Sequence, residues 1–293
     1  MRTGWEVQPI CAKLGPTKIV GGIQALPFKL SCFWRVSGML LVLFGLCVGP
    51  VHGTDSLDLL APVQTKQAYI GGGAYLQSQP YIDADAKVLP TPVVFFDNRL
   101  FYVRWARVGM YIYGQQDWGI SITAQPNPYG YQASDSPALA GMADRNSSWE
   151  GGFSVGGEND LGFAELTWFH DLLDNSNGTK VRLELGKFIK SGRWTVSPSV
   201  LAIWLSGDFN NYYYGVRTDE ATPSRPAYTA GAGLDWAAQT YLMYDINERW
   251  HILGNLRADY LASTITNSPI VDQDWIVSGL ISIMYSFPIK NHE

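Results

Sequence analysis

Few residues in this chain have types and spacings that could support chemistry. A hydrolase needs a nucleophile beside a base, and beyond the N-terminal region the only histidines are His170, His251 and His292. His251 shares one face of a strand pattern with Asp259, but eight residues along a strand span about 26 Å, which is beyond contact. A serine on a neighbouring strand stays open as a partner for His251, although no serine motif stands out. We therefore expect polar networks around these histidines, and we expect that the protein is not an enzyme.

Two segments resemble binding motifs only in part. Residues 174–179 (Asp-Asn-Ser-Asn-Gly-Thr) carry the oxygen donors of half a calcium loop, but the acidic residue that would close the coordination is missing. An Asx-rich surface loop is the simpler interpretation. Gly71, Gly72 and Gly73 follow a strand pattern without a helix or dinucleotide-binding spacing after them, which favours close packing within a strand. We expect no cofactor and no metal.

The elements that must position these residues have the pattern of β-strands. Between Leu234 and Tyr260, apolar and polar side chains alternate along two arms joined by the turn Asn247-Glu248-Arg249. Alternation over this length predicts strands. Aromatic residues lie toward both ends of each apolar face, which is typical of the girdles of a membrane barrel. A sheet can cross hydrocarbon only by closing on itself, because every backbone group there needs a partner.

We therefore expect an all-β, membrane-spanning, antiparallel up-and-down barrel. Twelve strands can be marked, and ten stay an alternative because the segments within 91–114 are shorter than the about 9–11 residues of a spanning strand. The predicted strands are 67–77, 91–97, 99–105, 107–114, 117–125, 148–158, 162–173, 179–190, 194–206, 232–246, 250–263 and 274–287. Long connections, expected to be extracellular, are 78–90, 126–147, 174–178, 207–231 and 264–273.

The alternation also assigns the two faces of the barrel wall. Positions predicted to contact lipid include Ile120, Phe153, Leu242 and Leu256. Polar positions predicted to face the lumen are Arg182, Glu184, Asp235, Gln239, Asn255, Arg257 and Asp259. In a wide barrel such residues line an aqueous channel, whereas in ten or twelve strands they can pair across the lumen and fill it. We expect a mostly plugged or narrow lumen.

Composition agrees with a membrane barrel. The 293 residues are 13% aromatic and 16% charged, with 30 glycines, whereas soluble domains carry about 25% charged residues. Mean hydropathy is −0.04, because lipid-facing and lumen-facing residues cancel. An acidic chain without basic clusters is not a nucleic-acid binder.

The N-terminal region has the features of an export signal. Residues 36–48 form an apolar run, Lys29 and Arg35 precede it, and small residues before Thr54 suit cleavage. The run is too short to span a bilayer as a helix. All three cysteines fall before this cut, as suits a protein that crosses an oxidising periplasm. We predict an extension with a signal peptide over residues 1–53 and a barrel domain over 54–293, and a mis-called start codon best explains the residues before the signal.

A long predicted loop carries the chain's most distinctive motif. The motif comprises Asn211, Tyr212, Tyr213, Tyr214 and Gly215, followed by Glu220 and Arg225. A loop this aromatic can pack on itself or fold into the barrel mouth. With the segments 139–145 and 267–271, it resembles the MipA/OmpV family of Gram-negative outer membranes, over about residues 68–287.

The resemblance implies an outer-membrane barrel without known enzymatic chemistry. Its namesake, the MltA-interacting protein, is a scaffold that joins a lytic transglycosylase to a murein synthase, and other members are described as antigens, adhesins or porin-like proteins. We therefore expect a scaffold for murein enzymes, embedded in outer-membrane lipid. A small-solute channel or a surface adhesin is the alternative. The family has no agreed active-site residues.

Overall fold

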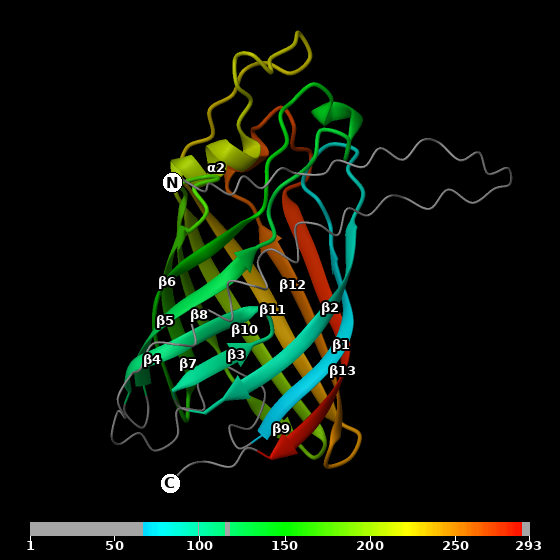
Figure 1. Ribbon diagram of the computed structural model, residues 1–293. Helices are drawn as coiled ribbons and strands as arrows, with labels where there is room; N and C mark the ends of the chain where they lie inside the picture. The colour runs from blue at the N-terminus through cyan, green and yellow to red at the C-terminus, as the bar shows by residue number, and fades with distance from the viewer. Residues whose placement is uncertain (1–66, 99, 115–117, 289–293) are drawn as a thin grey trace, which may run out of the picture. The chain divides into compact units, whose positions relative to one another are not determined.

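The computed structural model describes residues 67–98, 100–114 and 118–288, which form one closed antiparallel barrel (Figure 1). Apart from β8 (Thr179–Gly186) and β9 (Ile189–Ser191), strands that follow one another in sequence pair with each other, and β1 (Gln67–Gln77) closes the barrel by pairing with β13 (Trp275–Pro288). The predicted signal segment lies outside the described residues, so the boundary near residue 53 stays a prediction. Within the described part of the chain, no helix is long and apolar enough to cross a membrane.

The thirteen labelled strands form a barrel of twelve strands, since β9 continues β8 along the same edge of β10. The break between β8 and β9 lies opposite Pro198. The carbonyl of Pro198 accepts from the N–H of Lys187, but proline has no N–H to donate to Lys187 in turn. The twelve-strand prediction is therefore confirmed. The strands are β1 (Gln67–Gln77), β2 (Lys87–Asp97), β3 (Phe101–Arg104), β4 (Arg107–Gly114), β5 (Trp118–Asn127), β6 (Ser148–Asn159), β7 (Gly162–Asp171), β8 (Thr179–Gly186), β9 (Ile189–Ser191), β10 (Trp194–Leu205), β11 (Gly233–Asp245), β12 (Trp250–Tyr260) and β13 (Trp275–Pro288).

The two faces of the wall follow the predicted alternation. Phe153, Leu242 and Leu256 are 53%, 40% and 60% exposed on the outer face, while Asn255 is buried inside. Aromatic pairs lie near the ends of the strands, among them Trp194 with Tyr244 and Tyr260 with Trp275. This arrangement matches an apolar band bounded by aromatic girdles.

Long and short connections gather at opposite ends of the barrel (Figure 1). We call the two ends the loop end and the turn end. Connections at the loop end are 78–86, 128–147, 172–178, 206–232 and 261–274. Described connections at the turn end are 160–161, 192–193 and 246–249. The start of β1 and the end of β13 also lie at this end. The loop end also carries the short helices η2 (Pro137–Leu139), α2 (Gly207–Tyr214) and α3 (Ser263–Thr266).

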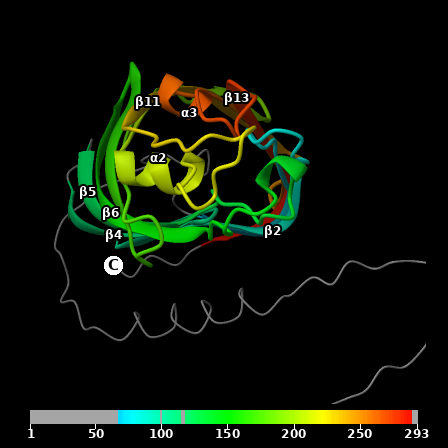
Figure 2. The same ribbon diagram turned by 90° about the horizontal axis from the view of Figure 1, so that it is seen from above.

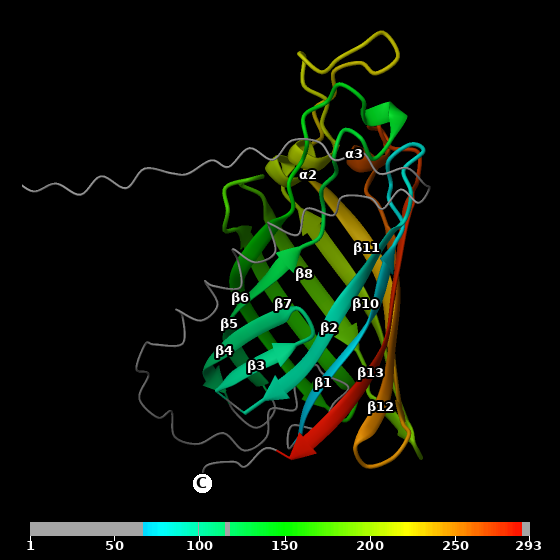
Figure 3. The same ribbon diagram turned by 45° about the vertical axis from the view of Figure 1, so that its right-hand side comes forward.

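The wall is low at β3 and β4. The predicted boundaries of β2 and β3 were wrong, whereas β4 spans the predicted residues 107–114. The strand predicted over 91–97 begins at Lys87, and the one predicted over 99–105 has only four residues. The hairpin therefore turns back far from the loop end (Figure 3). Beyond it, β2 pairs with β1 but no longer with β3. Beyond the hairpin, one edge of β2 has no neighbouring strand among the described residues. The backbone of Pro90 and Pro92 faces this edge, the same edge at which the carbonyl of Val94 accepts from the N–H of Trp105. Because proline has no N–H, this edge leaves no donor unpaired at these two positions.

Candidate functional site

The segment between β10 and β11 closes the loop end of the barrel. Residues 206–232 fold back over the mouth, and α2 lies across the barrel interior when seen from above (Figure 2). Ser206 caps the helix by accepting a hydrogen bond from the N–H of Phe209. The predicted loop does fold into the mouth, and the helix within it was not predicted.

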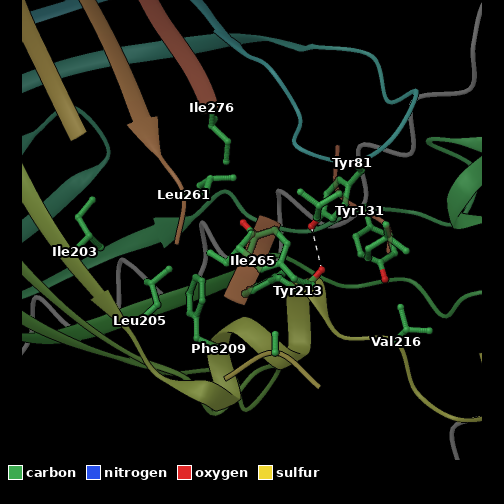
Figure 4. Close-up of a cluster of buried hydrophobic side chains, with 14 of the residues drawn as sticks. Tyr81, Tyr131, Ile203, Leu205, Phe209, Tyr213, Val216, Leu261, Ile265 and Ile276 are labelled. Atoms are coloured by element: carbon green, nitrogen blue, oxygen red, sulfur yellow. Dashed lines mark hydrogen bonds between the residues drawn. The ribbon is translucent and has the colours of Figure 1, made fainter. Parts of the chain in front are cut away.

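Aromatic side chains of α2 form the centre of an apolar cluster, which we call the mouth cluster (Figure 4). Tyr213 and Tyr214 are fully buried, and Phe209 nearly so. Other members come from the barrel wall, from the rest of 206–232 and from three further loops: Tyr81, Tyr131, Leu139, Met142, Leu201, Ile203, Leu205, Val216, Ala230, Ala237, Leu261, Ile265, Ile270, Val271 and Ile276. We call the segment 206–232 the plug. Full burial of one large apolar side chain contributes about 1.5–3 kcal/mol, so the cluster holds the plug firmly in place.

Three neighbouring loops satisfy the carbonyl groups at the end of α2. Tyr81 Oη donates to the carbonyl of Tyr213 at 3.2 Å, and Ser268 Oγ donates to that of Tyr214 at 2.6 Å. Arg145 Nε donates to the carbonyl of Tyr212 at 2.7 Å. The last carbonyls of a helix have no partner within it. Here those partners come from other loops, which ties the plug to its surroundings.

A buried ion pair anchors the outer part of the plug. Both carboxylate oxygens of Glu220 accept from Arg145 Nη2, at 2.8 and 3.0 Å, and both side chains are buried. Glu220 also accepts from the N–H groups of Ala143 and Arg217. Burial alone would raise the pKa of Glu220, but these hydrogen bonds and the charge of Arg145 lower it to about 2. Glu220 is therefore a charged anchor between two loops.

The family-motif residues thus meet in one place. Arg225 donates to the carbonyl group of Ala140, in the motif segment 139–145, and to that of Ala138 just before it. The third segment, 267–271, contributes Ser268 and two members of the mouth cluster. Asn211 Oδ1 accepts from the N–H of Ala230 at 3.3 Å. The motif therefore describes how the plug is built.

Gly215 ends α2 where a larger residue would not fit. A Cβ atom at this position would lie 2.3 Å from the carbonyl oxygen of Asn211 and 2.4 Å from its Oδ1 atom. Two atoms so close cannot coexist without displacement of the backbone. The glycine of the motif is therefore required by close approach.

Below the plug, charged side chains pair across the lumen. Arg107 makes a bidentate pair with Glu165, at 2.8 and 2.9 Å, and Arg182 reaches the same carboxylate at 2.9 Å. Arg182 also lies 3.3 Å from Glu184, which accepts from Gln239 Nε2 at 2.6 Å. This chain of contacts links β4, β7, β8 and β11, and Arg182 and Glu184 lie within it as the sequence suggested.

The other lumen residues predicted from the sequence lie on β11 and β12. Arg257 pairs with Asp259 on its own strand, at 2.5 and 2.8 Å. Asp235 is buried under the plug and accepts from the N–H of Ala262 at 2.8 Å. The structure therefore divides the predicted network into two groups. Sequence reasoning missed Arg107, since the short segments within 91–114 concealed which face of β4 it occupies.

Both incomplete binding motifs have structural roles. The carboxylate of Asp171 accepts from Leu173, Ser176 and Asn177, so the half calcium loop is an Asx-rich turn. Gly71 packs against β13, where a Cβ atom would lie 2.0 Å from the carbonyl oxygen of Ile283. Among the described residues, no group of His, Cys, Asp or Glu side chains is placed to hold a metal ion.

The turn end contains a pocket of about 570 Å³. Polar and charged residues that line the pocket include Arg193, Asp245, Glu248, Arg249, His251 and Ser286. Tyr69 and Met243 also line it, and Met243 belongs with Leu253 and Met284 to a second apolar cluster.

Within this pocket, His251 has two partners. Its Nδ1 atom lies 2.7 Å from Asp245 Oδ1, and its Nε2 atom lies 2.9 Å from Ser286 Oγ. The ring of Tyr69 packs edge-on against the imidazole, with centroids 5.0 Å apart. The serine that the sequence left open as a partner therefore lies on β13, the neighbour of β12.

Comparisons with known proteins agree with this architecture. A family model described as MltA-interacting protein MipA matches residues 70–287. The MltA-interacting protein of Escherichia coli K12 is 31% identical over 223 residues, covering 74% of this chain and 89% of that protein. The outer membrane protein OmpV of Vibrio cholerae is 30% identical over 154 residues, covering 52% of this chain and 60% of that protein. A solved outer membrane channel from Pseudomonas putida F1 covers 80% of this chain at 11% identity, with a TM-score of 0.39.

The matched region includes nearly every strand of the barrel and all three motif segments of the plug. Relatives in this group are named outer membrane proteins, in accord with the lipid-facing outer surface of the wall. The chain therefore belongs to the MipA/OmpV family and is an outer-membrane β-barrel.

Proposed function

We propose that this barrel is a scaffold that holds murein enzymes at the periplasmic face of the outer membrane. The observation that carries the proposal is the asymmetry of the barrel, with a mouth closed by the plug and a turn end that offers a pocket and rigid, charged turns. The Escherichia coli relative is named for its interaction with MltA, which favours a lytic transglycosylase as one partner. A murein synthase is the second expected partner.

The filled lumen favours a scaffold over a channel. A solute would have to displace α2 with its buried aromatics, and then pass the ion pairs of Arg107, Glu165 and Arg182. Breaking one buried pair costs about 3–5 kcal/mol. A closed path of this kind suits a protein whose work is done at one face.

The docking surface that we propose consists of the turns 246–249 and 160–161. Asn247 Oδ1 accepts from the N–H groups of Arg249 and Trp250, which fixes the first turn. In the second turn, Leu161 is 85% exposed, and Asn159 Oδ1 accepts from its N–H. Rigid turns lose little conformational entropy on binding, and an exposed apolar tip beside the acidic Asp160 suits an interface core with a polar rim.

Capture from envelope extracts tests the scaffold. The variant combines Glu248→Lys with Arg249→Glu, reversing both charges at the turn end, and the control is Asp219→Lys at the loop end. We expect the wild type and the control to retain a lytic transglycosylase, and the double variant to lose at least about tenfold of it, since close charge pairs couple by about 1.5 kcal/mol or more. Equal capture by all three proteins would contradict the proposed surface.

Conductance in a planar bilayer separates the scaffold from the channel alternative. The intact barrel should be silent, whereas removal of residues 209–228 should produce openings, because the plug then no longer covers the mouth. A steady ohmic conductance of the intact barrel, combined with failure to capture any murein enzyme, would favour the channel and defeat the scaffold.

A further inference from the structure

The pocket at the turn end contains an arrangement that the scaffold proposal does not use. Asp245 ends β11, His251 lies near the start of β12, and Ser286 lies near the end of β13. The distances of 2.7 Å from Asp245 to His251 and 2.9 Å from His251 to Ser286 place acid, base and hydroxyl in one hydrogen-bonded line. From this geometry we propose that Ser286, His251 and Asp245 form a serine-nucleophile site that hydrolyses carboxylic esters.

Each residue has the position that its role requires. With a proton on Nδ1 donated to Asp245, His251 leaves Nε2 free to accept from the hydroxyl of Ser286. That tautomer is the one in which the imidazole acts as a general base toward a serine. The packed ring of Tyr69 restricts the rotation of the imidazole. Such triads are recognised by geometry rather than by order along the chain.

The surroundings of the triad suggest the substrate. Tyr69, Met243 and Phe287 give the pocket apolar surface, whereas Arg193 and Arg249 bring positive charge. The N–H of Ser286 is already donated to the carbonyl of Arg249 at 2.7 Å, so the positive charge for a developing oxyanion has to come from arginine side chains. This weak oxyanion site suits an ester with a good leaving group rather than an amide. The substrate class is therefore a carboxylic ester with a good leaving group.

The reaction balances with water as the only co-reactant. Ser286 Oγ attacks the carbonyl carbon while its proton moves to His251 Nε2, and the tetrahedral intermediate collapses with cleavage of the bond from carbon to the leaving oxygen. The proton on Nε2 goes to that oxygen, which releases the alcohol and leaves an acyl group on Ser286. Water then attacks the acyl carbon and gives one proton to Nε2. The bond from that carbon to Ser286 Oγ breaks as Nε2 returns the proton to Oγ, which releases the carboxylic acid and the free serine.

A purely structural role for the same residues makes a different prediction. The Ser286 hydroxyl donates to the carbonyl of Glu248 at 3.2 Å in its other orientation, and this bond fastens the 246–249 turn to the last strand. A fastening role affects stability alone. A nucleophile also reacts with probes selective for activated serines, and its reactivity depends on His251.

The test uses the full-length barrel, refolded in detergent, with a fluorophosphonate probe and with p-nitrophenyl butyrate. The variants are Ser286→Ala and His251→Gln, and the matched control is Ser282→Ala. Ser282 is a buried serine on the same strand and face that donates to the carbonyl of Leu253. Heat-modifiable gel migration establishes that each variant is folded.

We expect the probe to label the wild type and the Ser282 variant with one adduct, located by mass spectrometry on Ser286. Labelling should disappear in Ser286→Ala and slow by about 10²-fold or more in His251→Gln, since a general base contributes about 10²–10⁴-fold. Butyrate hydrolysis should fall in parallel. An unlabelled wild type, an adduct on another serine, or an unchanged rate in His251→Gln would overturn the proposal. Neither assay needs a partner protein, so the result is independent of the scaffold proposal.

Discussion

The two ends of this barrel solve different problems with the same strands. At the loop end, three other connections pack against the one that carries α2 and bury its aromatics, so that the mouth becomes a second apolar core. At the turn end, connections of a few residues leave a polar pocket open, and charges line its rim. Long loops can cover the mouth because they have enough apolar residues to bury one another. The short turns have too few apolar residues to cover the turn end, so the polar groups there stay available for chemistry or for partners.

The largest expected difference between the two ends comes from their arginines. Arg145→Ala removes the main partner of buried Glu220 and should destabilise the closed plug by about 3–5 kcal/mol. Arg217 Nη2 lies 2.9 Å from Glu220 and remains as a partner in this variant. The destabilisation should therefore be near the lower limit of that range. Cleavage within 206–232 by a protease that acts on open loops should therefore become at least about 10²-fold faster, at 1.4 kcal/mol per tenfold change.

The matched change at the turn end is Arg249→Ala. Its guanidinium is exposed and donates only to Tyr285 Oη, at 3.3 Å, so the cost should be within about 0.5 kcal/mol. Equal protease sensitivity of the two variants would mean that the plug does not depend on its buried ion pair.

A smaller difference is expected between two glycines. Gly215→Ala places a Cβ atom against the backbone of Asn211 and should cost about 1–3 kcal/mol through overpacking. Gly192 lies in a turn at the other end, with φ of +59° and open space around it, so Ala there costs only about 1–2 kcal/mol of backbone strain. Plug opening measured by the same proteolysis should respond to the first change and not to the second. An effect of Gly192→Ala on cleavage of the plug would remove the distinction between the two ends.

The most gradual effect should come from pH. The pKa of Glu220 is lowered from 4.5 to about 2 in the closed plug, so the closed state binds a proton more weakly than the open one. The stabilisation by ionised Glu220 is therefore complete above pH 4.5 and is lost as the pH falls through that value toward 2. Proteolysis or conductance at pH 6, 4 and 2.5 should report progressive opening. Glu220→Gln should weaken the plug at pH 6 and remove this dependence, and an unchanged pH profile in that variant would assign the opening to another group.

Much of this protein could be determined from its sequence. Alternation with a period of two predicted twelve strands and the faces of residues such as Leu242 and Asn255, because a strand sends successive side chains to opposite sides. It also placed Arg182 and Glu184 in the lumen. The tyrosine motif identified the loop that closes the mouth, since so many aromatics in one loop must find somewhere to be buried.

Other features were decided only by tertiary structure, because they depend on which strands become neighbours and how high the wall rises between them. The early start of β2 involves Pro90 and Pro92, and the break at Lys187 lies opposite Pro198. Whether a proline fits within a sheet depends on which strand lies beside it. The bond of Arg107 to Glu165 joins residues 58 positions apart, and that of His251 to Ser286 joins residues 35 apart. Local patterns assign a face to each of these side chains. Only closure of the barrel brings the faces together, and with them the plug, the lumen ion pairs and the pocket at the turn end.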